Sequence, residues 1–218
     1  MTPIYRAGHT LCALIAKFGF GLKVFGQENL IQDGPAILAS NHASYLDPPL
    51  VGVSCPNDIY YLARKSLMDW PILGWLIKQL NTIPIDRERG DLGAVKAVLR
   101  ILKAGKQVIM FPEGTRSSDG KLQPGRAGIG LIIAKSLVPV VPVRIFGSFD
   151  ALPRSGGLRF TRIKVVIGKP LYFRKEDVAS DERDAYQALS DRVMAAIAEL
   201  QVPSARGSAP SGKQQKAA

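Results

Sequence analysis

The sequence predicts an α/β fold in which helices cover a single β-sheet. Short apolar runs that resemble buried strands alternate along the chain with longer segments of helical periodicity, an order typical of α/β domains. The length of 218 residues suits one domain with a sizeable core. The hydrophobic content, 46% of the residues, is ordinary for a folded globular protein. We therefore expect one folded α/β domain.

The first segment, residues 4–20, has the pattern of an amphipathic helix. Its apolar face is formed by Ile4, Leu11, Ile15 and Phe18. The unbroken apolar run is too short to span a bilayer, and the segment is a poor signal peptide. The helix either packs on the domain core or lies in a membrane interface, with Arg6, Lys17 and Lys23 near anionic head groups. The basic charge favours the membrane.

The remaining elements follow from periodicity, prolines and glycines. Strands are expected at residues 22–25, 36–39, 59–62, 82–85, 107–111, 138–145 and 162–167, and helices at 48–54, 91–103, 126–136 and 182–200. Pro139 and Pro142 predict that their strand is irregular or lies at a sheet edge, because proline cannot donate to the ladder. Gly105 is the expected C-cap of the helix before it. From Pro203 the polar composition predicts disorder.

Residues 66–80 form a very apolar segment that Pro71 and Gly74 interrupt, so short or kinked helices are expected. Such a segment is either core or an exposed apolar surface that touches lipid. In the second case Trp70 and Trp75 would lie at the interface, where amphipathic rings are favoured. The sequence leaves both alternatives open.

The charge balance is strongly basic. Against 18 Asp and Glu stand 29 Lys and Arg, which gives a net charge of +11. This excess predicts an acidic partner, which could be a nucleic acid, an anionic membrane surface or a phosphorylated substrate. The two cysteines, Cys12 and Cys55, argue against a disulfide framework and against a cysteine-based metal site. They favour a reduced, cytoplasm-facing compartment.

The stretch at residues 40–47 carries His42 and Asp47 five positions apart. On a helix this spacing separates two side chains by roughly 140°, and on a strand it places them on opposite faces. They can meet only across a turn, from the strand before His42 to a helix that Asp47 caps ahead of Pro48. Taken alone, the stretch is equally compatible with a functional pair and with a simple helix cap at Asp47 beside a polar loop residue at His42.

Two further polar clusters also follow apolar strands directly. Asp86 and Arg87 come after residues 82–85, and residues 113–116 come after residues 107–111. Ligands in open α/β sheets bind outside the carboxyl ends of the strands. If the strands are neighbours, all three clusters gather at that edge.

The chemistry of these residues is coherent. His42 is a candidate general base because histidine titrates near neutrality, and Asp47 could fix its tautomer. Arg87 and Arg116 could bind a phosphate through their planar guanidinium groups. The sequence has no nucleophile elbow, Gly-rich phosphate loop or zinc pattern, which favours direct transfer over a covalent intermediate.

Gly114 and Glu113, in the cluster at residues 113–116, have less sharply defined roles. Gly114 permits a tight turn and a close approach of the backbone to a ligand. Glu113 could orient an arginine or accept a hydrogen bond from a substrate hydroxyl. Ser44 shares the loop of His42 and is the serine placed to be its partner.

Four motifs in this order resemble the four blocks of the glycerolipid acyltransferases, whose short bacterial members are 1-acyl-sn-glycerol-3-phosphate acyltransferases. The blocks are Asn41-His42-x-Ser44-x-x-Asp47, Ile83-Pro84-Ile85-Asp86-Arg87, Phe111-Pro112-Glu113-Gly114-Thr115-Arg116-Ser117 and Val138-Pro139-Val140-Val141-Pro142-Val143. The resemblance covers about residues 20–170, and its first and third blocks are the specific ones. It implies a single mixed β-sheet flanked by helices (residues 22–202), a membrane-associating helix before it (1–21) and a disordered tail after it (203–218).

The resemblance also implies an activity. A fatty acyl group passes from acyl-CoA or acyl-carrier protein to the sn-2 hydroxyl of lysophosphatidic acid, giving phosphatidic acid. No metal or other cofactor takes part. The enzyme would lie on the cytoplasmic face of the membrane without spanning it, on an anionic lipid surface.

By position, the resemblance makes His42 the base and Asp47 its partner. It implies that the acceptor's phosphate and glycerol are held by Arg87, Glu113, Gly114 and Arg116. Ala43 stands where a larger polar residue is common, and Asn81 where glycine is common, so the acceptor is less certain than the reaction.

Two rival readings stay open. The same chemistry could act on another acceptor: glycerol 3-phosphate, another lysophospholipid or a lyso-aminolipid. Alternatively, the chain could be a non-catalytic basic protein that binds membranes or nucleic acid. Few aromatic residues are available to stack on bases, so nucleic acid is not the expected partner.

Overall fold

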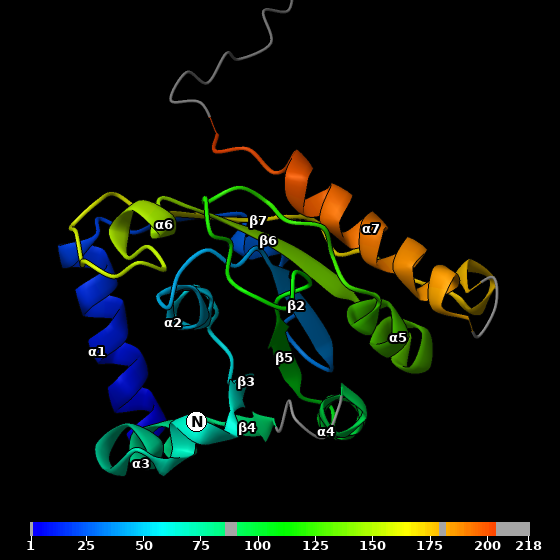
Figure 1. The fold of residues 1–218 in the computed structure, drawn as a ribbon, viewed down its shortest axis with the longest axis horizontal. Coiled ribbons are helices and arrows are strands. Elements are labelled where there is room, and N and C mark those ends of the chain that lie inside the picture. The colour runs from blue at the N-terminus through cyan, green and yellow to red at the C-terminus, as the bar shows by residue number, and fades with distance from the viewer. Residues whose placement is uncertain (1, 86–90, 179–181, 204–218) are drawn as a thin grey trace, which may run out of the picture.

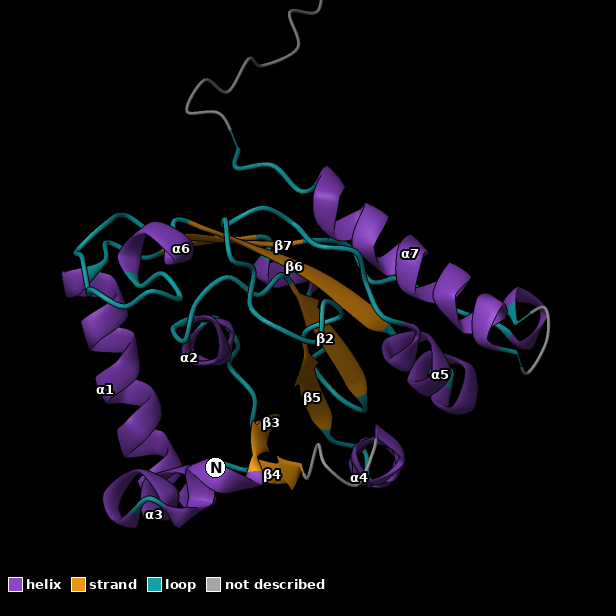
Figure 2. Ribbon diagram, in the orientation of Figure 1, coloured by secondary structure: helices purple, strands orange, loops and turns teal. Residues whose placement is uncertain are grey.

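A computed structural model describes residues 2–85, 91–178 and 182–203, which fold around a seven-stranded sheet with helices on both faces (Figures 1 and 2). The strand order is β1-β7-β6-β2-β5-β3-β4, and all pairs are parallel except β6 with β7. The strands are β1 Lys23–Phe25, β2 Ala36–Ser40, β3 Ile59–Arg64, β4 Thr82–Ile85, β5 Gln107–Met110, β6 Val140–Phe146 and β7 Lys164–Ile167. The predicted single mixed sheet flanked by helices is therefore confirmed.

The helices lie close to the expected positions, except α6, which was not predicted. They are α1 Pro3–Gly19, α2 Asp47–Val53, α3 Pro71–Gln79, α4 Asp91–Lys103, α5 Ala127–Ser136, α6 Ser148–Ala151 and α7 Arg183–Glu199, with 3₁₀ turns at Gln27–Asn29, Lys65–Asp69 and Lys175–Asp177. Figure 1 shows α1 and α2 on one side of the sheet and α4, α5 and α7 on the other. After α4, Gly105 adopts a φ of 73°, as expected of a residue that ends a helix in the left-handed region.

Strand β2 lies at the centre of the sheet and is buried on both faces. Leu38 belongs to the core under α1 and α2, whereas Ile37 and Ala39 belong to the core under α4, α5 and α7. Parallel strands covered on both faces are apolar throughout, which explains the continuous run of residues 36–39. The carboxyl end of β2, from which the His42 turn departs, is thus fixed by two cores.

Strand β6 contradicts the expectation of an edge strand. It lies inside the sheet, parallel to β2 and antiparallel to β7, although it contains Pro142. The main-chain N–H of Gly168 donates to the Pro142 carbonyl at 2.8 Å. Gly168 lies just past the end of β7, so the donor that proline lacks would have served a residue outside the paired region. An interior strand can therefore accept this proline.

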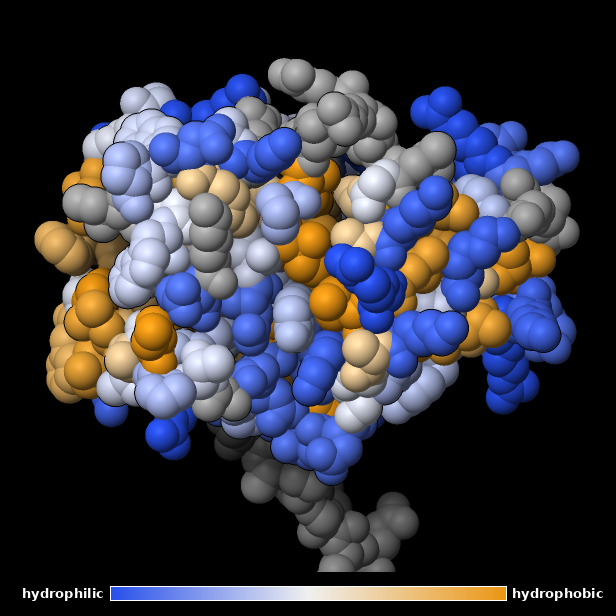
Figure 3. Space-filling view, turned by 90° about the horizontal axis from the view of Figure 1, so that it is seen from below, coloured by the Kyte–Doolittle hydropathy of each residue, from blue (hydrophilic) through white to orange (hydrophobic). Residues whose placement is uncertain are grey.

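Helix α1 turns its apolar face away from the domain. Tyr5 and Ala16 are buried on its inner side, but Phe18 is 77% exposed, and the other residues of the predicted apolar face are also exposed. In α3, Trp70, which precedes the first helical residue, and Trp75 are exposed as well. Figure 3 shows hydrophobic residues at the left of the face seen from below, the side on which Figure 1 places α1 and α3, and others among hydrophilic residues at the centre and right. Within the described residues, no helix has the length and apolar character needed to cross a bilayer.

Candidate active site

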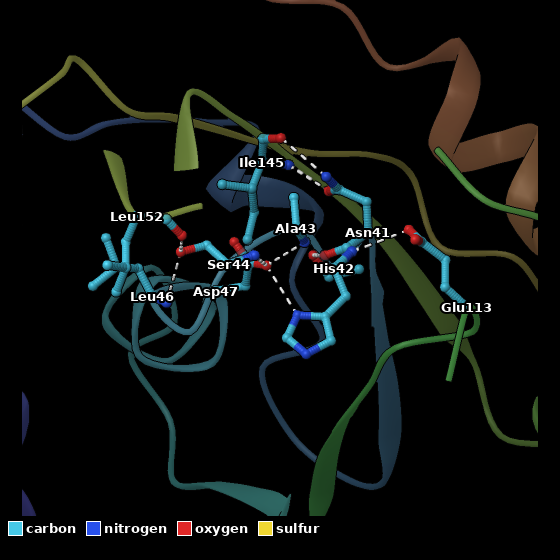
Figure 4. Close-up of polar contacts among 10 residues, drawn as sticks. Asn41, His42, Ala43, Ser44, Leu46, Asp47, Glu113, Ile145 and Leu152 are labelled. Carbon is cyan, nitrogen blue, oxygen red and sulfur yellow. Dashed lines mark hydrogen bonds and ion pairs between the residues drawn. The ribbon is translucent and has the colours of Figure 1, made fainter. Parts of the chain in front are cut away.

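His42 and Asp47 meet at the carboxyl end of β2, across the predicted turn (Figure 4). The distance from His42 Nδ1 to Asp47 Oδ2 is 2.9 Å. A carboxylate only accepts hydrogen bonds, so Nδ1 carries the proton and donates. The other ring nitrogen, Nε2, then has a free lone pair. The arrangement is that of a general base whose tautomer is set by an acid behind it.

Asp47 is not the N-cap of α2, contrary to the expectation. It is the first helical residue, Leu46 is the N-cap, and no side chain caps the helix. Instead, Asp47 Oδ2 accepts the main-chain N–H groups of Ala43 at 2.6 Å and Ser44 at 2.7 Å. The fully buried carboxylate therefore closes the turn on itself and leaves one direction for the imidazole.

The main chain of His42 is held from both sides by the segment after β5. Its N–H donates to Glu113 Oε1 at 3.0 Å, and its carbonyl accepts from the Ser117 N–H at 2.8 Å. The ring stacks on Phe111, with centroids 4.0 Å apart and planes at 20°. The parallel pairing of β2 with β5 makes these contacts possible, because both strands end at the same edge. Two of the three predicted polar clusters are thus brought together.

Neighbours of His42 fasten the turn to β6 and the segment after it. The Asn41 side chain bonds both main-chain groups of Ile145: it donates at 3.1 Å and accepts at 2.7 Å. The Ser44 hydroxyl donates to the Leu152 carbonyl at 2.8 Å and accepts from the Leu46 N–H at 3.1 Å (Figure 4). Ser44 is therefore engaged with the backbone and is not a partner of the histidine.

Glu113 is buried beside the histidine. Burial, which disfavours the charged form, raises the pKa of its carboxyl to about 7, and the nearby charge of Asp47 acts in the same direction. The N–H groups of His42 and Gln123 oppose this by stabilising the carboxylate. Its second oxygen, Oε2, is buried and lacks a hydrogen-bond partner among the described residues. Glu113 therefore fixes the His42 backbone with one oxygen and keeps the other available.

Gly114 occupies a position that other residues could not adopt without strain. Its φ is 69°, and a Cβ there would lie 2.8 Å from Arg126 Cδ. The turn it makes brings Arg116 back over the His42 loop. There the guanidinium carbon of Arg116 lies 3.4 Å from the centre of the Tyr45 ring.

Tyr45 is the residue that sequence reasoning missed. It occupies an unassigned position between His42 and Asp47, and its ring supports the Arg116 guanidinium by a cation–π contact. Arg116 Nη1 is buried and lacks a hydrogen-bond partner among the described residues. The sequence signal was an aromatic residue inside the motif. Its role becomes evident only in the structure, where Arg116 lies over the ring.

The second cluster is only partly visible. Asp86 and Arg87 lie outside the described residues, and β4 ends just before them at Ile85. Asn81 adopts a φ of 51°, a left-handed conformation that asparagine tolerates better than most residues, and this explains why glycine is the common alternative there. Ala43 is buried and lines a cavity of about 460 Å³ with Lys121 and Ile145.

No cluster of three or more His, Cys, Asp or Glu side chains that could hold a metal ion occurs in the part of the chain that the structure describes. Cys55 is buried, which raises the pKa of its thiol to about 12. A thiol with this pKa is almost entirely protonated near neutrality. The chemistry available at this edge is that of an imidazole base, buried carboxyl groups and a guanidinium.

Comparison with known proteins places this site in a family. The family model described as Acyltransferase matches residues 21–146, more than half of the chain. The 1-acyl-sn-glycerol-3-phosphate acyltransferase of Bacillus subtilis is 31% identical over 172 residues, which cover 78% of this chain and 83% of that protein. The chain belongs to the acyltransferase family, as the four motifs predicted.

Two further relatives extend the comparison. A chloroplastic 1-acyl-sn-glycerol-3-phosphate acyltransferase of Brassica napus is 35% identical over 162 residues, 72% of this chain; the match spans about half of that relative, 47% of its length. The crystal structure of the 1-acyl-sn-glycerophosphate acyltransferase of Thermotoga maritima superposes with a TM-score of 0.69 at 27% identity. It covers 91% of this chain and 83% of that one.

Proposed function

We propose that this protein transfers a fatty acyl group from acyl-CoA or acyl-carrier protein to the sn-2 hydroxyl of lysophosphatidic acid and forms phosphatidic acid. The observation that carries the proposal is the His42–Asp47 pair at the sheet edge, with Arg116 in the adjoining loop. The naming of the relatives as 1-acyl-sn-glycerol-3-phosphate acyltransferases supports it.

In the proposed reaction His42 acts as the base. Its Nε2 takes the proton of the acceptor hydroxyl as the oxygen attacks the thioester carbonyl carbon. Asp47 stabilises the imidazolium that forms, because its carboxylate accepts the Nδ1–H. When the tetrahedral adduct collapses, the C–S bond breaks and the leaving thiolate takes the proton from Nε2. The histidine returns to its starting state, and one ester replaces one thioester.

Direct transfer is favoured over an acyl-enzyme. Ser44, the serine of the His42 loop, is bonded to the Leu152 carbonyl, and burial raises the pKa of the Cys55 thiol, which keeps that thiol protonated. The base and the reactive thioester are together sufficient for acyl transfer. We therefore expect activity to persist in the presence of a metal chelator and without an added cofactor.

Arg116 is proposed to bind the acceptor phosphate. Its buried, unbonded Nη1 has a free-energy cost that an anionic oxygen would remove. Gly114 would let the backbone approach the same group, and Glu113 could accept from the glycerol through its free Oε2. Arg87, which lies outside the described residues, is proposed from its motif position as a second phosphate ligand.

The proposed location is the cytoplasmic face of a membrane, with α1 lying in the interface rather than spanning it. The support is the exposed apolar face of α1, together with exposed Trp70 and Trp75. The net charge of +11 would favour an anionic leaflet. The apolar substrates would then reach the site without leaving the membrane surface.

The test uses the purified full chain in mild detergent with lysophosphatidic acid and a long-chain acyl-CoA. Thiol release and phosphatidic acid formation are measured side by side, and His42→Ala should lower the turnover at least about 10³-fold while it remains folded. A folded His42→Ala protein with wild-type turnover would disprove the assigned base. Inactivity of the wild type with acyl-CoA and also with acyl-carrier protein would disprove the reaction.

The acceptor is tested in the same assay with Arg116→Ala. This substitution should raise the KM for lysophosphatidic acid and leave the KM for an acceptor without phosphate unchanged. If the wild type prefers glycerol 3-phosphate, another lysophospholipid or a lyso-aminolipid, the reaction stands and the assigned acceptor is wrong.

A further inference from the structure

A second cavity shares Phe146 and Gly147 with the first, but none of its lining residues belongs to the four motifs. Its volume is about 630 Å³, and three of its lining residues are basic: Lys23 on β1, Lys164 on β7 and Arg162 just before β7. The rest of its lining is Gly21, Phe146, Gly147 and Val202. No acidic residue of the described chain lines it. We call it the basic pocket.

The sheet register forces two of these charges together. Lys23 and Lys164 are direct partners in the parallel pairing of β1 with β7, and Lys164 is in turn the partner of Phe146 on β6. Side chains of directly paired residues point to the same face, so the two ammonium groups share one side of the sheet. Like charges placed opposite each other are destabilising. No described carboxylate pairs with either lysine to offset this.

Arg162, the third basic residue of the pocket, is positioned by a constrained backbone. Gly147 has a φ of 84°, and a Cβ at this position would lie 2.4 Å from the main-chain oxygen of Arg162. Only glycine allows this close approach of the segment after β6 to the segment before β7. The pocket therefore concentrates three cations at a cost in stability that a bound anion would offset.

The surroundings of the pocket indicate where the anion comes from. Phe18, in the last turn of α1, and Phe160, two residues before Arg162, are 77% and 72% exposed. Phe160 packs on Phe20 with ring centroids 5.5 Å apart, so this loop and the end of α1 form one surface. Gly21, directly after Phe20, lines the pocket. Val24 and Val165, which alternate with the two lysines, face the core under α1, so the lysines lie on the opposite face of the sheet and the aromatic surface meets the pocket at its rim, at Gly21 and Arg162. Aromatic rings at the rim of a cationic pocket are suited to the level of lipid head groups, where apolar and charged groups meet.

We propose that the basic pocket binds the phosphate of an anionic phospholipid head group and so sets the depth and orientation of the protein on the membrane. The lysines supply compact charges and Arg162 a planar pair of donors, a combination suited to phosphate oxygens. The inference rests on the membrane location proposed above. It adds a lipid-binding site that is separate from the acceptor site at His42.

The experiment uses the full chain with Lys23→Gln and Lys164→Gln combined. A matched control changes two exposed lysines elsewhere, Lys106 and Lys175, to glutamine, which gives the same net charge. Binding is measured by co-sedimentation with vesicles of phosphatidylcholine alone and with added phosphatidylglycerol. The pocket variant should lose about tenfold in affinity for the anionic vesicles, and the control less than about threefold. Binding to neutral vesicles should be the same for all three proteins.

A second measurement detects the repulsion itself. Without lipid, the pocket variant should melt about 1–3 °C above the wild type because the paired charges are gone, and the control should not. Soluble glycerol 3-phosphate and inorganic phosphate should each raise the Tm of the wild type less than vesicles with the same phosphate concentration do. Equal stabilisation of the wild type by a soluble phosphate, lost in the pocket variant, would show that the pocket serves a free anion and would overturn the lipid assignment.

The other outcomes are equally decisive. A pocket variant that binds anionic vesicles as its control does would disprove the site, as would an equal loss on neutral vesicles. Activity on a detergent-solubilised acceptor should be unchanged in the pocket variant. His42→Ala should show the opposite behaviour, with binding kept and turnover lost. The two proposals can therefore fail independently.

Discussion

The turn that carries His42 contrasts with helix α1. The turn is held by hydrogen bonds within the chain, whereas the apolar face of α1 is exposed. In the turn, a buried Asp47 oxygen accepts three hydrogen bonds, and the His42 main chain is bonded on both sides. In α1, the apolar face points outward, and its most exposed member, Phe18, is 77% exposed. The first region is held by hydrogen bonds within the chain, although Asp47 Oδ1 and Glu113 Oε2 are buried without a partner among the described residues. The second leaves its apolar face exposed, and we propose that a membrane covers it. Substitutions should therefore separate catalysis from membrane attachment.

The largest effect is expected at Asp47. Asp47→Asn should lower kcat about 10³-fold, because the neutral amide no longer stabilises the imidazolium form of His42. Binding to vesicles should not change, since α1 is untouched. Turnover is measured by thiol release, and circular dichroism controls for folding. An Asn variant with wild-type kcat would remove Asp47 from the mechanism.

The next effect concerns stability and pH at Glu113. Its pKa is raised from 4.5 to about 7 by burial, so the folded state holds this proton more tightly than the unfolded state. The resulting stability is fully present below pH 4.5 and is lost as the pH rises through 7. The loss should be about 3 kcal/mol in the free energy of unfolding.

Glu113→Gln isolates this contribution, because the amide oxygen can still accept from the His42 N–H. Urea unfolding of both proteins from pH 4.5 to 8 should show the wild type losing stability relative to the variant as the pH rises. Parallel curves would show that the carboxyl group titrates alike in the folded and unfolded states. A Phe18→Ser variant keeps Glu113, so its stability should fall with pH in parallel with the wild type.

A smaller effect is expected at Tyr45, which lies at the rim of the site. Tyr45→Leu should raise the KM for the phosphorylated acceptor about tenfold and change kcat less than twofold, because it frees the Arg116 guanidinium without touching His42. Tyr45→Phe keeps the ring and should behave as the wild type. An equal KM rise for an acceptor without phosphate would argue against the link to Arg116.

The smallest effect is expected in α1. Phe18→Ser should weaken vesicle binding about fivefold and leave detergent activity and Tm unchanged, because the ring is already exposed in the folded chain. Tyr172→Ser is the matched control, since Tyr172 is 68% exposed elsewhere in the fold. Equal losses in the two variants would remove α1 from membrane attachment. A fall in Tm for Phe18→Ser, without a fall for Tyr172→Ser, would show that Phe18 stabilises the fold by packing rather than serving membrane attachment.

The sequence predicted most of the architecture because each element carries a local signal. Pro71 marked the start of α3, whereas Gly74 lies inside that helix and does not end it, and the helix at residues 91–103 agrees with α4. The prediction for Pro142 was wrong because the missing donor matters only where a partner strand needs it, and β7 has ended there. The N-cap prediction for Asp47 was wrong because its carboxylate is used by the turn before the helix.

The candidate site could likewise be predicted only in part from the sequence. The spacing of His42 and Asp47 correctly required a turn, and the chemistry of the two residues predicted their pairing. The engagement of Ser44 with Leu152 and the stacking of Tyr45 under Arg116 depend on segments distant in the sequence. No local pattern reports such contacts.

Helices α1 and α7 show what the sequence determines and what the tertiary structure determines. Both have 17 residues and both were predicted as helices, because a period of 3.6 places apolar residues on one face. In α7 that face is buried against the sheet and α5 through Leu189, Val193 and Ile197, whereas in α1 the predicted face is exposed. Periodicity is a local property and determined both helices. What covers the apolar face depends on which surfaces the rest of the chain leaves free, and only the tertiary structure decided that.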